Sequence, residues 1–119
     1  MKKGFLLAIT VLLLNACAVQ APLQGHGGPA GVLMAQADQY AADGDNGQAI
    51  ALLERAVRID PRNGHAWLRL ARLHYDLGDL NKAEQFARRA MQFAGADQGL
   101  KRECQLLLDK LSRQTSKLG

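Results

Sequence analysis

Residues 64–90 of the chain read GHAWLRLARLHYDLGDLNKAEQFARRA, and this stretch decides the fold. The same spacing of small and apolar residues occurs 34 residues upstream. A period of this length, with small residues at fixed offsets, is typical of helix–turn–helix units that stack into an array. The shift pairs identical residues: Ala37 with Ala71, Gly44 with Gly78, Asp45 with Asp79, Ala49 with Ala83, Arg55 with Arg89 and Ala56 with Ala90.

The turn residues of this repeat have physical reasons of their own. Gly44 and Gly78 are expected to end the first helix of each unit, because the position after a helix commonly needs a positive φ. Asp45 and Asp79 follow as N-cap candidates, whose carboxylates accept hydrogen bonds from the free N–H groups of the next helix. Pro61 is expected to stop the second helix of the first unit. The aligned alanines allow the two helices of a unit to cross closely.

These signals predict an all-α fold of two helix–turn–helix repeats plus a C-terminal capping helix. The repeats occupy residues 31–97, as units at about 30–63 and 64–97. A capping helix is predicted over 98–113, with residues 114–119 as a frayed tail. Arrays need such a helix to cover their apolar end; dimerisation or partner docking remains the alternative role. Its apolar stripe consists of Leu100, Cys104, Leu107, Leu108 and Leu111, and Asp97 is its cap.

The N-terminal residues have the anatomy of a secretory signal. Lys2 and Lys3 form a short positive region, an apolar run follows, and the small residue Ala16 stands just before Cys17. The apolar run is far shorter than the ~20 residues of a membrane-spanning helix. Residues 1–16 are therefore predicted to be a signal peptide. The alternatives are an ordinary signal in which the cysteine is incidental, and a short uncleaved anchor.

The run Leu14-Asn15-Ala16-Cys17 is similar to a bacterial lipobox. This resemblance implies that Cys17 is the lipidation site and that a covalent lipid anchors the mature chain to a membrane. Ala18, rather than aspartate, follows the cysteine, which in such lipoproteins implies the periplasmic face of the outer membrane. Residues 17–30 are rich in glycine and proline and are predicted to be a flexible tether.

The repeat resembles the tetratricopeptide repeat. That resemblance implies that the first helices of successive units line a concave groove that binds a protein partner. Arg69, Arg72 and Tyr75 would share one helix face and suit a peptide carboxylate or an acidic, partly apolar segment; the alternative is a solvated face with a packed tyrosine. The groove residues that position matching implies are Met34, Asp38, Ala41, His65, Leu68, Arg69, Arg72, Tyr75 and Asp76.

The chain also resembles the tetratricopeptide lipoproteins that activate bifunctional penicillin-binding proteins. The similarity lies in Arg58–Arg62, Trp67–Ala71, Gly78-Asp79 and Ala83–Gln85. It implies a membrane-anchored periplasmic module that docks to a peptidoglycan synthase and activates it. The alternative is a pilotin-like assembly factor for a pilus or a secretion pore. Self-association through the last helix is a further alternative.

The residues give no sign of catalysis. His65 and His74 lie too far apart to ligate one metal ion from a single helix face. The sequence contains no glycine-rich nucleotide-binding motif and no Ser-x-x-Lys nucleophile motif. If Cys17 is lipidated, Cys104 has no partner and is expected to be a small buried hydrophobe. The formal charge is +4, and half of it lies in the signal. We therefore expect no enzyme activity, metal, small-molecule substrate or nucleic acid, and no cofactor beyond the lipid.

Overall fold

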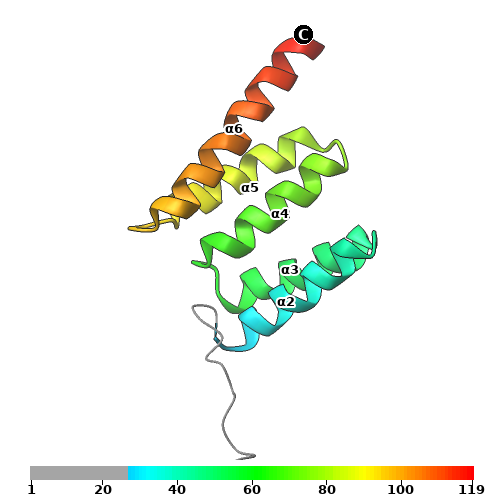
Figure 1. Cartoon of the computed structure of the whole chain (residues 1–119), viewed down its shortest axis with the longest axis vertical. Coiled ribbons are helices and arrows are strands. Elements are labelled where there is room, and N and C mark those ends of the chain that lie inside the picture. Colours follow the sequence, from blue (N-terminus) through cyan, green and yellow to red (C-terminus); the bar gives the residue numbers. More distant parts are fainter. Residues whose placement is uncertain (1–26) are drawn as a thin grey trace, which may run out of the picture.

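The computed structural model describes residues 27–119, and every element in that range is an α-helix (Figure 1). The all-α fold of two helix pairs and a closing helix is confirmed. The predicted signal, Cys17 and most of the tether lie outside the described residues. The helices are α2 (Pro29–Ala42), α3 (Asn46–Ile59), α4 (Gly64–Asp76), α5 (Leu80–Gln92) and α6 (Gln98–Leu118).

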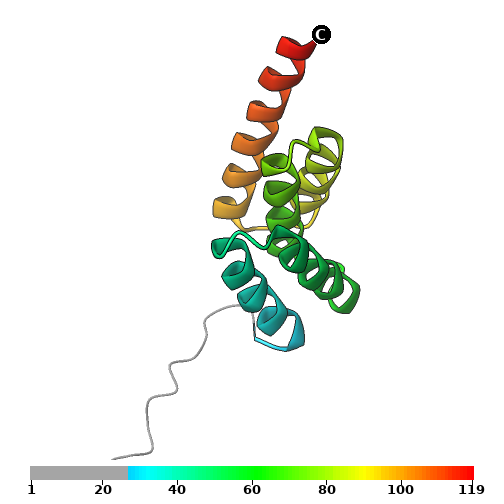
Figure 2. The same cartoon turned by 90° about the vertical axis from the view of Figure 1, so that its right-hand side faces the viewer.

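The helices form a stack of antiparallel pairs. The α2–α3 pair lies at one end, the α4–α5 pair lies in the middle, and α6 packs beside α5 at the other end (Figures 1 and 2). Helix α6 begins 34 residues after α4, so it takes the place of the first helix of a third repeat. Among the described residues, no helix is both long and apolar enough to cross a membrane.

The turn inside each unit has the predicted chemistry. Gly44 and Gly78 adopt φ values of 82° and 79°. The aspartate after each glycine donates its backbone N–H to the carbonyl five residues earlier: Asp45 to Tyr40 and Asp79 to His74, both at 2.9 Å. This is the Schellman arrangement. The same two aspartates then cap α3 and α5 through their carboxylates, so one residue ends a helix and begins the next.

Two apolar clusters hold the stack together. One joins α2, α3 and α4, and the other joins α4, α5 and α6. Trp67 and Phe86 contact both clusters, with ring centroids 5.6 Å apart. The indole of Trp67 donates a hydrogen bond to the Pro61 carbonyl at 2.8 Å. This tryptophan therefore packs between the helices, and Cys104 is fully buried in the second cluster as expected.

Helix α4 approaches its neighbours closely at Gly64. A Cβ at this position would lie 2.8 Å from Leu100 Cδ2 and 3.0 Å from the Ala90 carbonyl oxygen. Only glycine fits such spacing without displacing a neighbour. The start of α4 is therefore clamped between α5 and α6.

Both ends of the helical region differ from the prediction. Helix α2 starts at Pro29, within the predicted tether, because proline suits the first turn of a helix. Helix α6 continues to Leu118, so the predicted frayed tail at 114–119 is wrong. No glycine or proline interrupts the helix after Gly99. The hydroxyls of Thr115 and Ser116 donate to the carbonyls of Leu111 and Ser112, at 3.1 and 2.6 Å, which keeps them within the helical geometry.

Candidate partner-binding groove

The first helices of the units enclose a hollow of about 450 Å³ between α2 and α4. This hollow, bordered at one side by α6, is termed the α2–α4 groove. Six of the predicted groove residues line it: Asp38, Ala41, His65, Leu68, Arg69 and Arg72. Four further residues that the sequence analysis did not assign also line it: Ala37, Leu53, Leu73 and Glu103.

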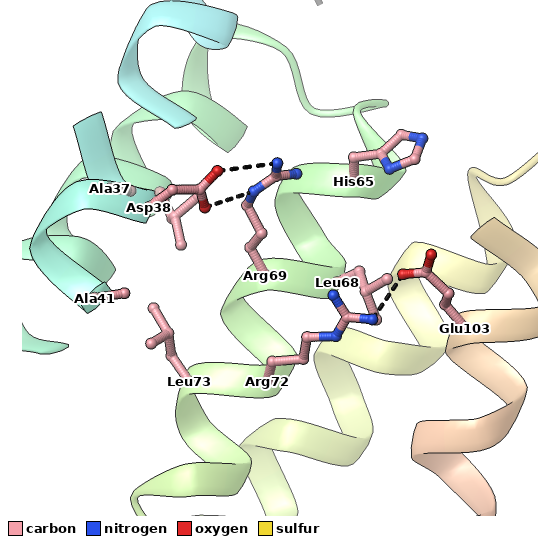
Figure 3. A pocket seen from close by; sticks show the side chains of 10 residues that line it. Ala37, Asp38, Ala41, His65, Leu68, Arg69, Arg72, Leu73 and Glu103 are labelled. Carbon is pink, nitrogen blue, oxygen red and sulfur yellow. Dashed lines mark hydrogen bonds and ion pairs between the residues drawn. The ribbon is translucent and has the colours of Figure 1, made fainter. Parts of the chain in front are cut away.

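One wall of the α2–α4 groove is fixed by an ion pair between α2 and α4. Arg69 Nε donates to Asp38 Oδ1 at 2.9 Å, and its terminal nitrogen donates to Oδ2 at 3.1 Å (Figure 3). The planar guanidinium matches the two carboxylate oxygens, which gives the pair a defined geometry. Both side chains remain partly exposed, at 32% and 53% of their surface.

The opposite wall is fixed by a second pair, between α4 and α6. Arg72 donates to Glu103 Oε2 at 2.6 Å (Figure 3). Under the 34-residue shift, Arg72 corresponds to Asp38 and Glu103 corresponds to Arg69. The repeat thus places an ion pair at the same height in successive units, with the signs exchanged.

These pairs change the expected chemistry of the groove. Arg69 and Arg72 were expected to be available together for a partner's carboxylate, but each already binds a carboxylate of this chain. The reason is that they lie on opposite sides of the groove face of α4, one turned to α2 and the other to α6. Exposed ion pairs stabilise by only ~0–1 kcal/mol. A partner's carboxylates therefore compete with weak intramolecular bonds.

Tyr75 and Asp76 do not line the α2–α4 groove. They lie in an adjoining hollow of about 580 Å³ between α4 and α6, termed the α4–α6 cleft. Its other lining residues are Arg72, Glu103, Leu106, Leu107, Lys110 and Arg113. The ammonium of Lys110 stands 5.2 Å from the centre of the Tyr75 ring, a cation–π contact.

Two apolar groove residues lie deeper than position matching implied. Met34 is 2% exposed and packs in the first cluster, where its sulfur accepts a hydrogen bond from Asn63 Nδ2 at 3.3 Å. Met34 does not line the α2–α4 groove, because α2 turns this side chain toward the start of α4; it borders a neighbouring hollow that Asp38 and Arg69 also line. Leu68 is also 2% exposed, and it forms the floor of the α2–α4 groove.

His65 forms a third interhelical pair at the end of the groove. Its Nε2 lies 2.9 Å from Asp97 Oδ2. Asp97 also caps α6 by accepting from the Leu100 N–H at 2.9 Å. This backbone hydrogen bond, followed by the bond with His65, lowers the pKa of the Asp97 carboxyl. Within residues 27–119, no group of three or more His, Cys, Asp or Glu side chains is placed to hold a metal ion.

The contribution of α6 to this surface was missed. Residues 98–113 were assigned as a cap, with dimerisation or partner docking as the alternative, and none of them was named as a groove residue, yet Glu103 and Lys110 line the hollows described above. The signal that could have found them is the repeat period itself. Extending the 34-residue shift once more takes Arg69 to Glu103, which identifies α6 as a third groove helix.

The chain is similar to a known repeat family and to a solved structure. A family model described as tetratricopeptide repeat matches residues 40–102. A solved structure, the globular C-terminal domain of LpoP from P. aeruginosa, superposes with a TM-score of 0.73 at 33% sequence identity. The similarity covers 77% of this chain and 87% of that domain. No curated protein matches the chain. Both matches confirm the resemblance that the repeat indicated.

Proposed function

The chain belongs to the tetratricopeptide repeat family, and we propose on this basis that it docks to a bifunctional penicillin-binding protein and raises its synthetic activity. The observation that carries the proposal is the similarity to the LpoP domain, which extends over most of both chains. The sequence's own resemblance to lipoproteins that activate such synthases supports it further. Tetratricopeptide repeats bind proteins through stacked helices, so the family alone supports docking to a protein partner. The identity of that partner and its activation rest on the similarity to LpoP.

Docking would use the concave side of α2, α4 and α6. The side chains there are charged and partly exposed, and the ion pairs of Arg69 and Arg72 hold them in defined positions. Ordered side chains lose less conformational entropy on binding than mobile ones. Activation requires that docking favour the more active conformation of the synthase, because a ligand shifts an equilibrium only through differential affinity.

The proposed lipid on Cys17 sets where docking occurs. Cys17 lies outside residues 27–119, and the proposal takes it as the anchor to the outer membrane. Because α2 begins at Pro29, the chain from Cys17 to this helix would span at most about 40 Å, at ~3.4 Å per residue. The synthase would therefore have to present its docking segment close to the outer membrane.

The proposal is tested by reconstitution. The full-length lipidated chain is added to a purified bifunctional penicillin-binding protein of the same bacterium, and glycan polymerisation and crosslinking rates are measured. We expect both binding and a rise in rate. The double variant Arg69→Glu, Arg72→Glu should weaken both. Arg55→Glu, Arg58→Glu on α3 makes the same change in charge on exposed residues away from both hollows, and should behave as wild type.

The outcomes separate the parts of the proposal. Binding without a change in rate would retain docking and reject activation. Absence of synthase binding would reject the penicillin-binding protein as partner. In that case, crosslinking in intact cells that recovers a secretin or a pilus component would favour the assembly-factor alternative.

A further inference from the structure

We propose that the α4–α6 cleft binds an acidic segment of the partner protein, with an apolar side chain against Tyr75 and Leu106 and carboxylates against Lys110 and Arg113. The identity of the partner rests on the proposed function, whereas the chemistry of the segment follows from the cleft itself.

The cleft offers an apolar seat at its floor and rim. Leu106 is 58% exposed, although it borders a concave surface. Leu107 is buried beneath it at 7% exposure, and the ring of Tyr75 is partly buried on the facing side of α4. An exposed leucine and an aromatic ring that line one hollow favour insertion of an apolar side chain, because binding removes apolar surface from water.

The charges that line the cleft are not balanced by ion pairs among residues 27–119. Arg72 is neutralised by Glu103. Among residues 27–119, neither Lys110 nor Arg113 forms an ion pair: Lys110 lies over Tyr75, and Arg113 Nε donates to the Asp109 backbone carbonyl at 3.2 Å. Asp76 is the one acidic lining residue besides Glu103. Two cations thus remain against one carboxylate, which attracts an acidic ligand.

The spacing of these groups matches a peptide. Leu106, Lys110 and Arg113 lie four and three residues apart, which places them on one face of α6. They extend over about 10 Å at ~1.5 Å per residue, the length of a few residues of bound chain. A flat anionic membrane fits less well, because it cannot enter a concave site.

The test uses a defined probe. A fluorescent synthetic peptide of Glu, Leu and Phe residues is titrated against the full-length lipidated chain in detergent micelles, and fluorescence anisotropy reports its affinity. A counterpart with each Glu replaced by Lys is the charge control. We expect saturable binding of the acidic peptide that weakens with salt. The Lys counterpart should bind at least about tenfold more weakly.

Variants assign binding to the cleft. Lys110→Glu, Arg113→Glu should weaken the acidic peptide by at least about tenfold, and Leu106→Ser should weaken it without changing the salt dependence. Arg55→Glu, Arg58→Glu makes the same change in charge on α3 and should leave affinity unchanged. Circular dichroism of each variant verifies that the helices are retained.

Several outcomes would overturn the proposal. The first is that the acidic peptide does not bind. The second is that wild type and the Lys110→Glu, Arg113→Glu variant bind the acidic peptide with equal affinity. The third is that wild type binds the acidic peptide and its Lys counterpart with equal affinity. Binding of short-chain phosphatidylglycerol in place of the peptide, with loss in the same variant, would assign the cleft to lipid headgroups instead.

Parallel titration with the synthase keeps the two proposals apart. If the peptide binds in the cleft and the synthase does not bind at all, the cleft proposal stands and the proposed function fails. If the synthase binds wild type and the cleft variant equally and the peptide does not bind, the proposed function stands and the cleft proposal fails.

Discussion

Asp38 and Arg69 lie 31 residues apart in the sequence, yet two hydrogen bonds of 2.9 and 3.1 Å join them across the groove. Arg72 and Glu103 repeat this relationship one unit later with the same separation. Helix α4 supplies the cation of both pairs, and its neighbours supply the carboxylates. This arrangement favours one order of stacking, because α2 beside α6 would bring carboxylates together at the same height.

The first prediction concerns the strength of the Asp38–Arg69 pair. In a double-mutant cycle with Asp38→Ala and Arg69→Ala, we expect a coupling energy of ~0.5 kcal/mol, and at most about 1 kcal/mol, because both side chains are partly exposed. Urea unfolding followed by circular dichroism measures it. A cycle that combines Asp38→Ala with Arg72→Ala is the control, with coupling near zero. A coupling of several kcal/mol would show that the groove pairs are too strong to be exchanged by a partner.

The second prediction concerns the close approach at Gly64. Gly64→Ala should lower the free energy of unfolding by about 1–3 kcal/mol, because the new methyl group would meet Leu100 and the backbone of α5. Gly47→Ala is the matched control. Its Cβ would meet only Asp45 Oδ1 at 3.8 Å, and the gain in helix propensity should make it neutral or stabilising by up to ~1 kcal/mol. Equal effects at both positions would contradict the clamp.

The third prediction concerns acid stability through Asp97. The pKa of this carboxyl is lowered from its ordinary value of 3.8, first by the Leu100 N–H bond and then by His65. A lowered pKa means that the folded state binds the proton less well than the unfolded state. The stabilisation is therefore present above pH 3.8 and is lost as the pH falls through the folded-state pKa. Asp97→Asn keeps a capping oxygen but removes the charge.

Urea midpoints measured across this acid range test the contribution of Asp97. We expect the wild type to lose more stability than Asp97→Asn as the pH falls, since the variant has no carboxyl to protonate at this position. Asp43→Asn is a control on an exposed carboxylate for which no ion pair is found in residues 27–119. Parallel curves for wild type and Asp97→Asn would contradict the assignment.

The fourth prediction concerns the thiol of Cys104. Burial, as the main cause, raises the pKa of this thiol, and the side chain is fully enclosed in the second cluster. A neutral, enclosed thiol is unreactive. In the lipidated chain we expect labelling by a thiol reagent to be slow and to accelerate with the population of open or unfolded molecules as urea is added. The exposed control Cys104→Ser, Ser112→Cys should label at once; equally fast labelling of wild type would contradict the burial.

Local features of the fold were predictable because their causes are local. A glycine that adopts positive φ and an aspartate that caps the following helix act within a few residues of chain. Gly44, Asp45, Gly78 and Asp79 therefore have the predicted roles. The end of α6 was not predictable from composition alone, because a polar tail with good helix formers continues a helix once its first turns are packed.

The groove was predictable only as a set of positions. Helical spacing places His65, Leu68, Arg69 and Arg72 on one face of α4, and they do line one hollow. Met34 borders a neighbouring hollow instead, because it stands at the boundary between the groove face and the core face of α2. A small rotation of the helix decides which side such a residue takes, and packing against Asn63 settles it.

The repeat, its turns and its caps follow from the amino-acid sequence alone, because a 34-residue period and short-range capping specify helix pairs that stack in one way. Which charged side chains already bind a partner within the chain depends on the packed structure. The partners of Arg69 and Arg72 lie 31 residues away on separate helices, and their pairing depends on the rotation and height of those helices. Those pairs balance the charges of the α2–α4 groove, whereas Lys110 and Arg113 in the α4–α6 cleft form no ion pair among the described residues.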